Sequence, residues 1–100
     1  MEFHGIKVGE WTPSSETDLT ARAIRLEVSK FNDDFGMDDK HKFYIVSGMQ
    51  GYKLTKDLKE IRAAIEHDEK MARRQIRKIG KRKSNLENME YRKKHGGRIV

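Results

Sequence analysis

The sequence FYIVSGMQGYKLT, residues 43–55, decides the fold of this chain. It opens with aromatic and β-branched residues, which favour a strand, and it closes with the similar run YKLT. Between the two runs, Gly48 and Gly51 bracket Met49 and Gln50, and both glycines accept the positive φ of a tight turn. The stretch therefore predicts a β-hairpin.

A helix is expected upstream of the hairpin, over residues 15–32. Ile24 and Val28 recur at helical spacing within it. Ser14 or Ser15 is the expected N-cap, because a serine side chain accepts a backbone hydrogen bond at a helix start. The acidic, glycine-containing run NDDFGMDDKHK then predicts a loop before the hairpin.

The N-terminal residues predict a short edge strand, over residues 3–11. Its apolar residues are interrupted by two glycines. Trp11 is expected either in the core or as the cover of an otherwise open sheet edge. Tyr52 is expected to pack under the hairpin.

The C-terminal half predicts one uninterrupted helix from residue 55 to about residue 92, with Thr55 as its cap. Apolar residues recur every seven positions, and a companion heptad position is apolar only in part, because Asp68 and Arg82 also occupy it. Gly80 is the expected soft point, at about 1 kcal/mol relative to alanine. At ~1.5 Å per residue such a helix exceeds about 50 Å, so we expect it to dimerise as a coiled coil. The expected dimer contacts are Leu58, Ile61, Ile65, Ala72, Ile79 and Leu86.

The expected fold class is α+β, in a single small unit. We expect a small α/β head over residues 1–54, the long basic helix over 55–92 and a flexible tail over 93–100. The chain has 100 residues, of which 38% are charged and 35% hydrophobic, so its core must be thin.

Charge is divided unevenly between the two halves. Residues 1–54 carry seven Lys/Arg and nine Asp/Glu, which leaves −2, whereas the remainder carries fifteen and seven, which leaves +8. Residues 70–83 alone contain eight Lys/Arg and no acid. This asymmetry favours a polyanionic or acidic partner for the C-terminal half, although a solvated helix face stays an alternative.

Several classes of protein are disfavoured by the sequence. There is no cysteine, which fits a reducing cytoplasm. No apolar run is long enough to cross a bilayer, and the N-terminal residues lack the apolar segment of a signal peptide. The four histidines lack metal-ligand spacing, and no nucleophile has an evident base, so we expect no metal, no cofactor and no enzymatic activity.

Three short motifs carry a resemblance to a known family. They are the RAIR run from Arg22 to Arg25, the strand end IVS followed by GYKL, and Asp57 with the Glu60–Ile61 pair. In this order they resemble the recognition helix, wing and trailing basic helix of small phage-encoded winged-helix DNA-binding proteins, over about residues 17–61. The resemblance implies DNA binding in phage gene regulation or replication, in the cytoplasm of a bacterial host.

Two departures from that family keep a second interpretation open. A complete helix-turn-helix places one or two helices before the recognition helix, and the residues before residue 15 contain glycines and a proline instead. The loop before the hairpin also carries four aspartates, which repel phosphate. The alternative is a phage-encoded, anti-CRISPR-like inhibitor that binds a host nucleoprotein.

The residues expected to contact nucleic acid, with DNA favoured over RNA, come from three places. Arg22 and Arg25 lie on the first helix, where Asp18 and Glu27 are available as competing ion-pair partners. Gln50 and Lys53 lie in the hairpin, within reach of a groove or backbone. The basic segment contributes Lys70, Arg73, Arg74, Arg77, Lys78, Lys81, Arg82 and Lys83.

Overall fold

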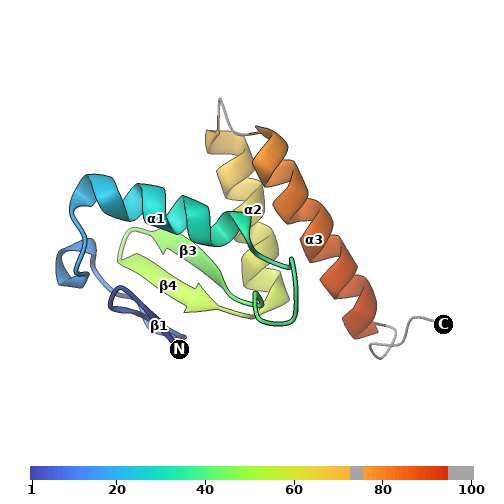
Figure 1. Ribbon diagram of the computed structural model, residues 1–100, viewed down its shortest axis with the longest axis horizontal. Coiled ribbons are helices and arrows are strands. Elements are labelled where there is room, and N and C mark those ends of the chain that lie inside the picture. The colour runs from blue at the N-terminus through green and yellow to red at the C-terminus, as the bar shows by residue number, and fades with distance from the viewer. Residues whose placement is uncertain (73–75, 95–100) are drawn as a thin grey trace.

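The β-hairpin lies at the centre of the computed structural model, which describes residues 1–72 and 76–94 (Figure 1). Strand β3 (Tyr44–Gly48) pairs antiparallel with β4 (Gly51–Thr55), and Gly48 opposite Gly51 leaves a two-residue turn. Only the second of these glycines has positive φ, 114°. A Cβ there would lie 2.0 Å from the carbonyl oxygen of Thr12, so the position requires glycine. The predicted hairpin is confirmed.

The outer edge of β4 is covered by the N-terminal segment. Thr12 and Tyr52 exchange backbone hydrogen bonds of 2.8 and 2.9 Å, and the Gly9 N–H donates to the Leu54 carbonyl at 2.9 Å. The Trp11 ring lies over Gly48, where an added Cβ would be 3.0 Å away. The backbone around Gly9 and Thr12 therefore covers the open edge, whereas the Trp11 ring packs on the turn end of the hairpin and the residue stays 38% exposed. The predicted edge strand is shorter than expected, because β1 (Glu2–Phe3) and β2 (Ile6–Lys7) form a small hairpin of their own.

Helix α1 (Ala21–Asp33) begins later than predicted. Ser14–Glu16 forms the 3-10 helix η1, and the chain then turns extended at Thr17. The cap of α1 is Thr20, whose hydroxyl accepts from the Ala23 N–H at 3.2 Å. The serine caps were therefore wrong: the two serines form the separate short turn.

The C-terminal half folds back on itself, so the single long helix was wrong. Helix α2 (Leu58–Met71) ends where Ala72 adopts an extended conformation, with φ −80° and ψ 128°. Helix α3 (Ile76–Lys94) then runs antiparallel to α2, and Arg62 of α2 pairs with Glu90 of α3 (Figure 1). The cap of α2 is Asp57 rather than Thr55, because its carboxylate accepts from the Lys59 N–H at 3.0 Å. Gly80 lies inside α3 and marks no break.

Folding back buries the apolar heptad residues within one chain. Ile61 and Ile65 are fully buried, Ile79 is 3% exposed and Leu86 is 1% exposed. With Phe35 and Tyr44 they form one apolar cluster. A lone rod would leave this stripe in water, and pairing α2 with α3 removes it at ~25 cal/mol per Å².

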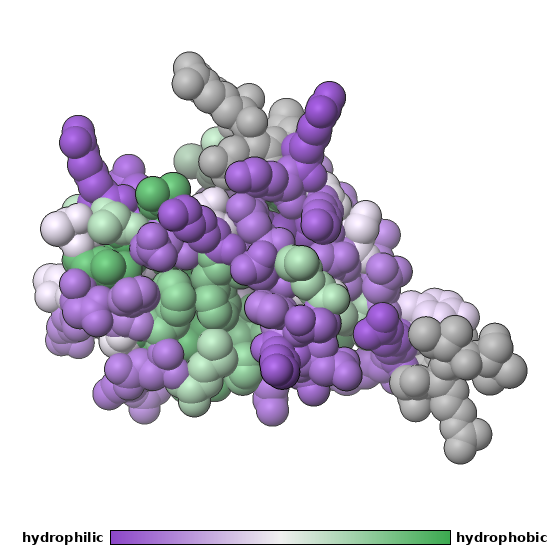
Figure 2. All heavy atoms as spheres, viewed as in Figure 1, coloured by the Kyte–Doolittle hydropathy of each residue, from purple (hydrophilic) through white to green (hydrophobic). Residues whose placement is uncertain are grey.

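A second apolar cluster lies on the other face of the hairpin. Its members are Ile6, Ile24, Val28, Ile45 and Leu54. Because successive strand residues face opposite sides, Tyr44 faces the α2–α3 side and Ile45 faces α1. Tyr52 packs against this second cluster, as predicted. Figure 2 shows that polar side chains cover most of one face, with apolar side chains gathered below α1.

Asn32 joins α1 to β3. Its side-chain amide donates to the Ile45 carbonyl at 3.0 Å and its side-chain oxygen accepts from the Ile45 N–H at 2.7 Å. Asn32 is 2% exposed. The second edge of the hairpin is therefore closed at this point by a side chain rather than by a strand.

The α+β class and the hairpin preceded by a short helix are confirmed. The two-part C-terminal helix corrects the predicted division at residues 55–92. The predicted tail falls partly in α3, which continues to Lys94, and residues 95–100 lie outside the described part of the chain.

Candidate nucleic-acid interface

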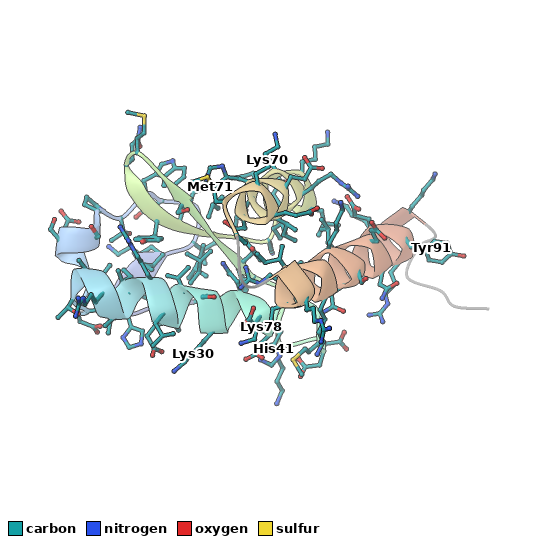
Figure 3. The ribbon with its side chains drawn as sticks, turned by 90° about the horizontal axis from the view of Figure 1, so that it is seen from above. Lys30, His41, Lys70, Met71, Lys78 and Tyr91 are labelled. Carbon is teal, nitrogen blue, oxygen red and sulfur yellow. The ribbon has the colours of Figure 1, made fainter. Side chains whose placement is uncertain are left out.

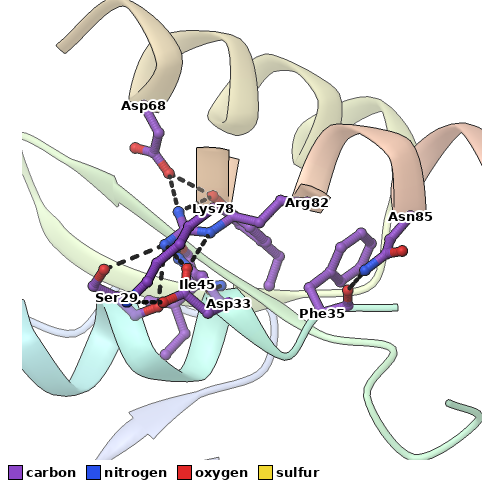
Figure 4. Close-up of polar contacts among 10 residues, drawn as sticks. Ser29, Asp33, Phe35, Ile45, Asp68, Lys78, Arg82 and Asn85 are labelled. Atoms are coloured by element: carbon purple, nitrogen blue, oxygen red, sulfur yellow. Dashed lines mark hydrogen bonds and ion pairs between the residues drawn. The ribbon is translucent and has the colours of Figure 1, made fainter. Parts of the chain in front are cut away.

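Arg82 belongs to the basic segment by sequence, but it lies inside the protein (Figure 4). Its side chain is 3% exposed. The guanidinium donates to the Asp33 carboxylate at 2.6 and 3.0 Å, to the Tyr44 hydroxyl at 3.0 Å and to the Ser29 carbonyl at 3.1 Å. Asp68 of α2 lies 3.5 Å from the same guanidinium. Arg82 therefore joins α1, β3 and α2 to α3, and its assignment to a nucleic-acid contact was wrong.

Burial and charge fix the protonation states in this network. Burial raises the pKa of the Tyr44 hydroxyl above its ordinary value, and the neighbouring Asp68 carboxylate raises it further. Burial lowers the pKa of Arg82, but Tyr44 and the Asp33 hydrogen bond outweigh this and hold that pKa above its usual value. The tyrosine stays neutral and the arginine stays charged at physiological pH. The arginine therefore carries its positive charge inside the protein, where the tyrosine hydroxyl accepts a hydrogen bond from it.

Lys53 of the hairpin is also occupied. Its ammonium lies 2.6 Å from the Glu60 carboxylate and 4.8 Å from the centre of the Trp11 ring. The side chain is only 15% exposed. We therefore remove Lys53 from the expected contacts, because a phosphate would have to displace Glu60. Lys83 likewise lies 3.5 Å from Glu69.

Arg22 and Arg25, by contrast, are exposed and have no ion-pair partner among the described residues. The two acids that the sequence offered as partners are taken by other residues: Asp18 pairs with His4 at 2.7 Å, and Glu27 lies 3.7 Å from Lys30. Arg22 and Arg25 stand on the same stripe of α1 as Ser29 and Asp33, at spacings of three and four residues.

That stripe leads to the first turns of α3, because Ser29 and Asp33 hold Arg82. Arg77, Lys78 and Lys81 are exposed there. Lys78 keeps a distant contact of 3.8 Å with Asp33 and its side chain is 64% exposed. Figure 3 shows Lys30 and Lys78 on one side of the molecule, and Lys70 and Met71 on the other. We call the exposed cations on the arginine stripe of α1 and at the start of α3 the basic surface: Arg22, Arg25, Arg77, Lys78 and Lys81.

The basic segment is thus divided by the fold. Lys70 faces away from the basic surface, Arg82 is internal and Lys83 is paired. Arg73 and Arg74 lie outside the described residues. The exposed cations that remain on α3 are Arg77, Lys78 and Lys81. The basic surface also includes Arg22 and Arg25 of α1, which lie about fifty positions earlier in the sequence.

The hairpin turn presents different chemistry. Gln50 is exposed, as a contact residue must be. Met49 beside it is fully exposed, and Trp11 is 38% exposed at the same end of the hairpin. The turn itself therefore offers an amide and apolar groups, and no cation.

The predicted dimer contacts are used inside the chain. Ile61, Ile65, Ile79 and Leu86 belong to the core, and Leu58 and Ala72 are half-buried against it. Heptad spacing was interpreted as a seam between two copies, whereas it marks the seam between α2 and α3. The assignment of these six residues to a dimer interface was wrong.

A signal for this fold-back was present in the charges. Glu69 pairs with Lys83, Asp68 with Arg82 and Arg62 with Glu90, and each pair is centred on residue 75 or 76. Opposite charges placed symmetrically about one point predict two antiparallel helices. The partners of Arg82 on α1 and β3 carried no such signal, because Asp33 was interpreted as part of a loop.

Within residues 1–72 and 76–94, no group of three or more His, Asp or Glu side chains is arranged to hold a metal ion. In that same part of the chain, none of the helices is both long and apolar enough to cross a membrane.

Known proteins give no match. The chain matches no protein-family model, no curated protein and no solved structure.

Proposed function

We propose that this protein binds nucleic acid, with duplex DNA as the preferred form, through the basic surface. One observation carries the proposal. Arg22 and Arg25 are exposed on the stripe of α1 that leads to the exposed cations at the start of α3, and none of the acids near them in the sequence neutralises them. Exposed cations on two packed helices are suited to a phosphate backbone, and the contact of Lys78 with Asp33 is distant, at 3.8 Å. The phage winged-helix resemblance supports the same role, in a regulatory or replication accessory protein of the bacterial cytoplasm.

An inhibitor of a nucleoprotein could use the four aspartates before the hairpin to mimic phosphate, but their contacts give this role little support. Asp33 is committed to Arg82. Asp38 accepts hydrogen bonds from the Lys40 N–H at 2.7 Å and from His41, and the His41 bond is the main cause that lowers the pKa of this carboxylate. Two of the four aspartates therefore hold the protein's own structure together.

Fluorescence anisotropy of a labelled DNA duplex across a salt series tests the proposal. Each phosphate contact contributes about 0.9 to the slope of log affinity against log salt. Replacing Arg22, Arg25, Lys78 and Lys81 by glutamine should lower the magnitude of the slope by up to about 3.6. An RNA duplex in a parallel series decides between the two nucleic acids.

The matched control removes the same charge elsewhere. Lys7, Lys59, Lys70 and Lys94 are exposed and lie outside the basic surface. Their replacement by glutamine should leave the slope nearly unchanged. An equal fall in both variants, or no binding at low salt, defeats the proposal.

A second candidate, an anti-CRISPR-like inhibitor that binds a host nucleoprotein, is favoured by the hairpin turn. Met49 is fully exposed beside Trp11, and a methionine at a turn suits an adaptable protein contact better than phosphate. Under this candidate, Met49→Ser abolishes capture of a nuclease-resistant host partner and leaves the DNA salt slope intact. If capture requires nucleic acid, this candidate fails.

A further inference from the structure

The largest of the described cavities lies at the end of the molecule away from the hairpin turn, and its rim is basic. Its volume is about 740 Å³, and it is lined by Lys42, Lys56, Asp57, Leu58, Met89 and Lys93. None of the three lysines belongs to the basic surface. We call this site the lysine-rimmed cavity.

The fold brings the three lysines together from distant parts of the chain. Tyr44 pairs with Thr55 at the open end of the hairpin, so Lys42 and Lys56 lie just beyond that end. Helix α2 starts at Leu58, two residues after Lys56, and Figure 1 shows that this start follows closely on the end of β4. The antiparallel pair of Arg62 with Glu90 brings the last turn of α3, with Lys93, to the first turn of α2.

The rim carries a net positive charge. All three lysines are exposed, and none has an ion-pair partner among the described residues. Asp57 is the one acid of the lining, and its carboxylate is engaged by the Lys59 N–H at the start of α2. Three lysines against one engaged carboxylate favour an anionic ligand.

The floor of the cavity is apolar. Leu58 and Met89 are half-buried, and both pack against the apolar cluster that contains Ile61 and Leu86. Methionine adapts its shape to different apolar groups. The site therefore offers a place for an apolar side chain, surrounded by charges that attract carboxylates.

We propose that the lysine-rimmed cavity binds an acidic peptide segment of a partner protein, with one apolar side chain of that segment seated on Leu58 and Met89. A nucleic acid fits less well. No aromatic side chain lines the cavity, so a base has no ring on which to stack, and a phosphate backbone leaves the apolar floor unused. The volume lies within the range of ligand sites, about 300–1,000 Å³. This proposal is independent of the basic surface.

Chemical-shift mapping on the full ¹⁵N-labelled chain tests it, with the capped peptide Glu-Glu-Leu-Phe-Glu-Glu as the probe. The peptide should shift the amides of Leu58 and Met89 and saturate there. Replacing Lys42, Lys56 and Lys93 by glutamine should weaken its affinity at least about tenfold. The matched charge control, with the exposed Lys7, Lys40 and Lys70 replaced by glutamine, should retain most of the affinity.

Two further probes separate the apolar floor from simple charge attraction. A peptide with Ser-Gly in place of Leu-Phe should bind more weakly. Met89→Gln should weaken the original peptide and Met89→Leu should preserve its affinity, with far-UV circular dichroism confirming that both variants fold.

Three results would overturn the proposal. They are shifts confined to the basic surface, equal affinity of the two peptides, and an oligonucleotide that shifts Leu58 and Met89 with the same dependence on the three lysines. The last result would assign the cavity to nucleic acid instead.

Discussion

Arg82→Met tests whether Arg82 holds the fold together rather than binding a partner. Methionine keeps most of the aliphatic stem, so the cost of a new cavity is small. The substitution removes hydrogen bonds to Asp33, Tyr44 and Ser29 and leaves two carboxylates without their cation. Breaking a fully buried ion pair costs about 3–5 kcal/mol.

The expected cost here is smaller because both carboxylates retain some water. The Asp33 side chain is 21% exposed and that of Asp68 is 28% exposed. We therefore expect Arg82→Met to lower the free energy of unfolding by about 2–3 kcal/mol. Urea titration followed by far-UV circular dichroism at neutral pH measures it.

Lys81→Met is the matched control for this measurement. Lys81 is the exposed neighbour of Arg82 in the same helix, so its replacement should change stability by less than about 0.5 kcal/mol. In DNA binding the larger effect should belong to the other variant: Lys81→Met lowers the magnitude of the salt slope, and Arg82→Met leaves it unchanged. If Arg82→Met costs less than about 0.5 kcal/mol, the reasoning from burial fails.

Four further substitutions test other parts of the fold. Asn32→Ala should lower stability by about 2–3 kcal/mol and speed hydrogen exchange at the Ile45 amide, since both Ile45 backbone groups lose their partner; unchanged exchange there would contradict the assignment. Gly80→Ala should raise stability by about 1 kcal/mol, because no atom lies within 4 Å of the added Cβ, whereas Gly51→Ala should lower it by more than about 1 kcal/mol because its φ is 114°; the opposite order in thermal melts would be inconsistent with these backbone conformations. Because burial raises the folded-state pKa of Tyr44, the unfolded chain ionises first, so stability present at neutral pH should fall as pH rises above about 10; Tyr44→Phe should flatten that alkaline fall, and an identical fall in both proteins would refute the linkage.

The hairpin was predictable because its determinants are local. Strand-forming residues, a two-residue turn and a glycine at positive φ all lie within residues 43–55. The cover of its edge by the backbone around Gly9 and Thr12 was not predictable, since the pairing of Thr12 with Tyr52 spans forty residues.

In the C-terminal half, the seven-residue repeat predicted which residues are buried but not what they pack against. A seven-residue repeat identifies the apolar stripe correctly, but it does not say whether the stripe meets another copy or another part of the same chain. The polar heptad positions indicate contact within one chain, because Asp68 and Arg82 face each other across the helical hairpin. Arg22 and Arg25 were predictable as candidates. That their stripe of α1 leads to α3 was not predictable, because the packing of the two helices depends on the buried contacts of Arg82.

The distance between the two ends of the helical hairpin tests the account most directly. The chain contains no cysteine, so Lys59→Cys and Arg92→Cys allow spin labels at two exposed positions only. Double electron–electron resonance, with labelled protein diluted in unlabelled protein, then measures the distance within one chain. Antiparallel helices that pair Arg62 with Glu90 predict about 20 Å, including the label arms. A continuous helix predicts about 50 Å, and that result would contradict the buried position of Arg82, the basic surface and the lysine-rimmed cavity together.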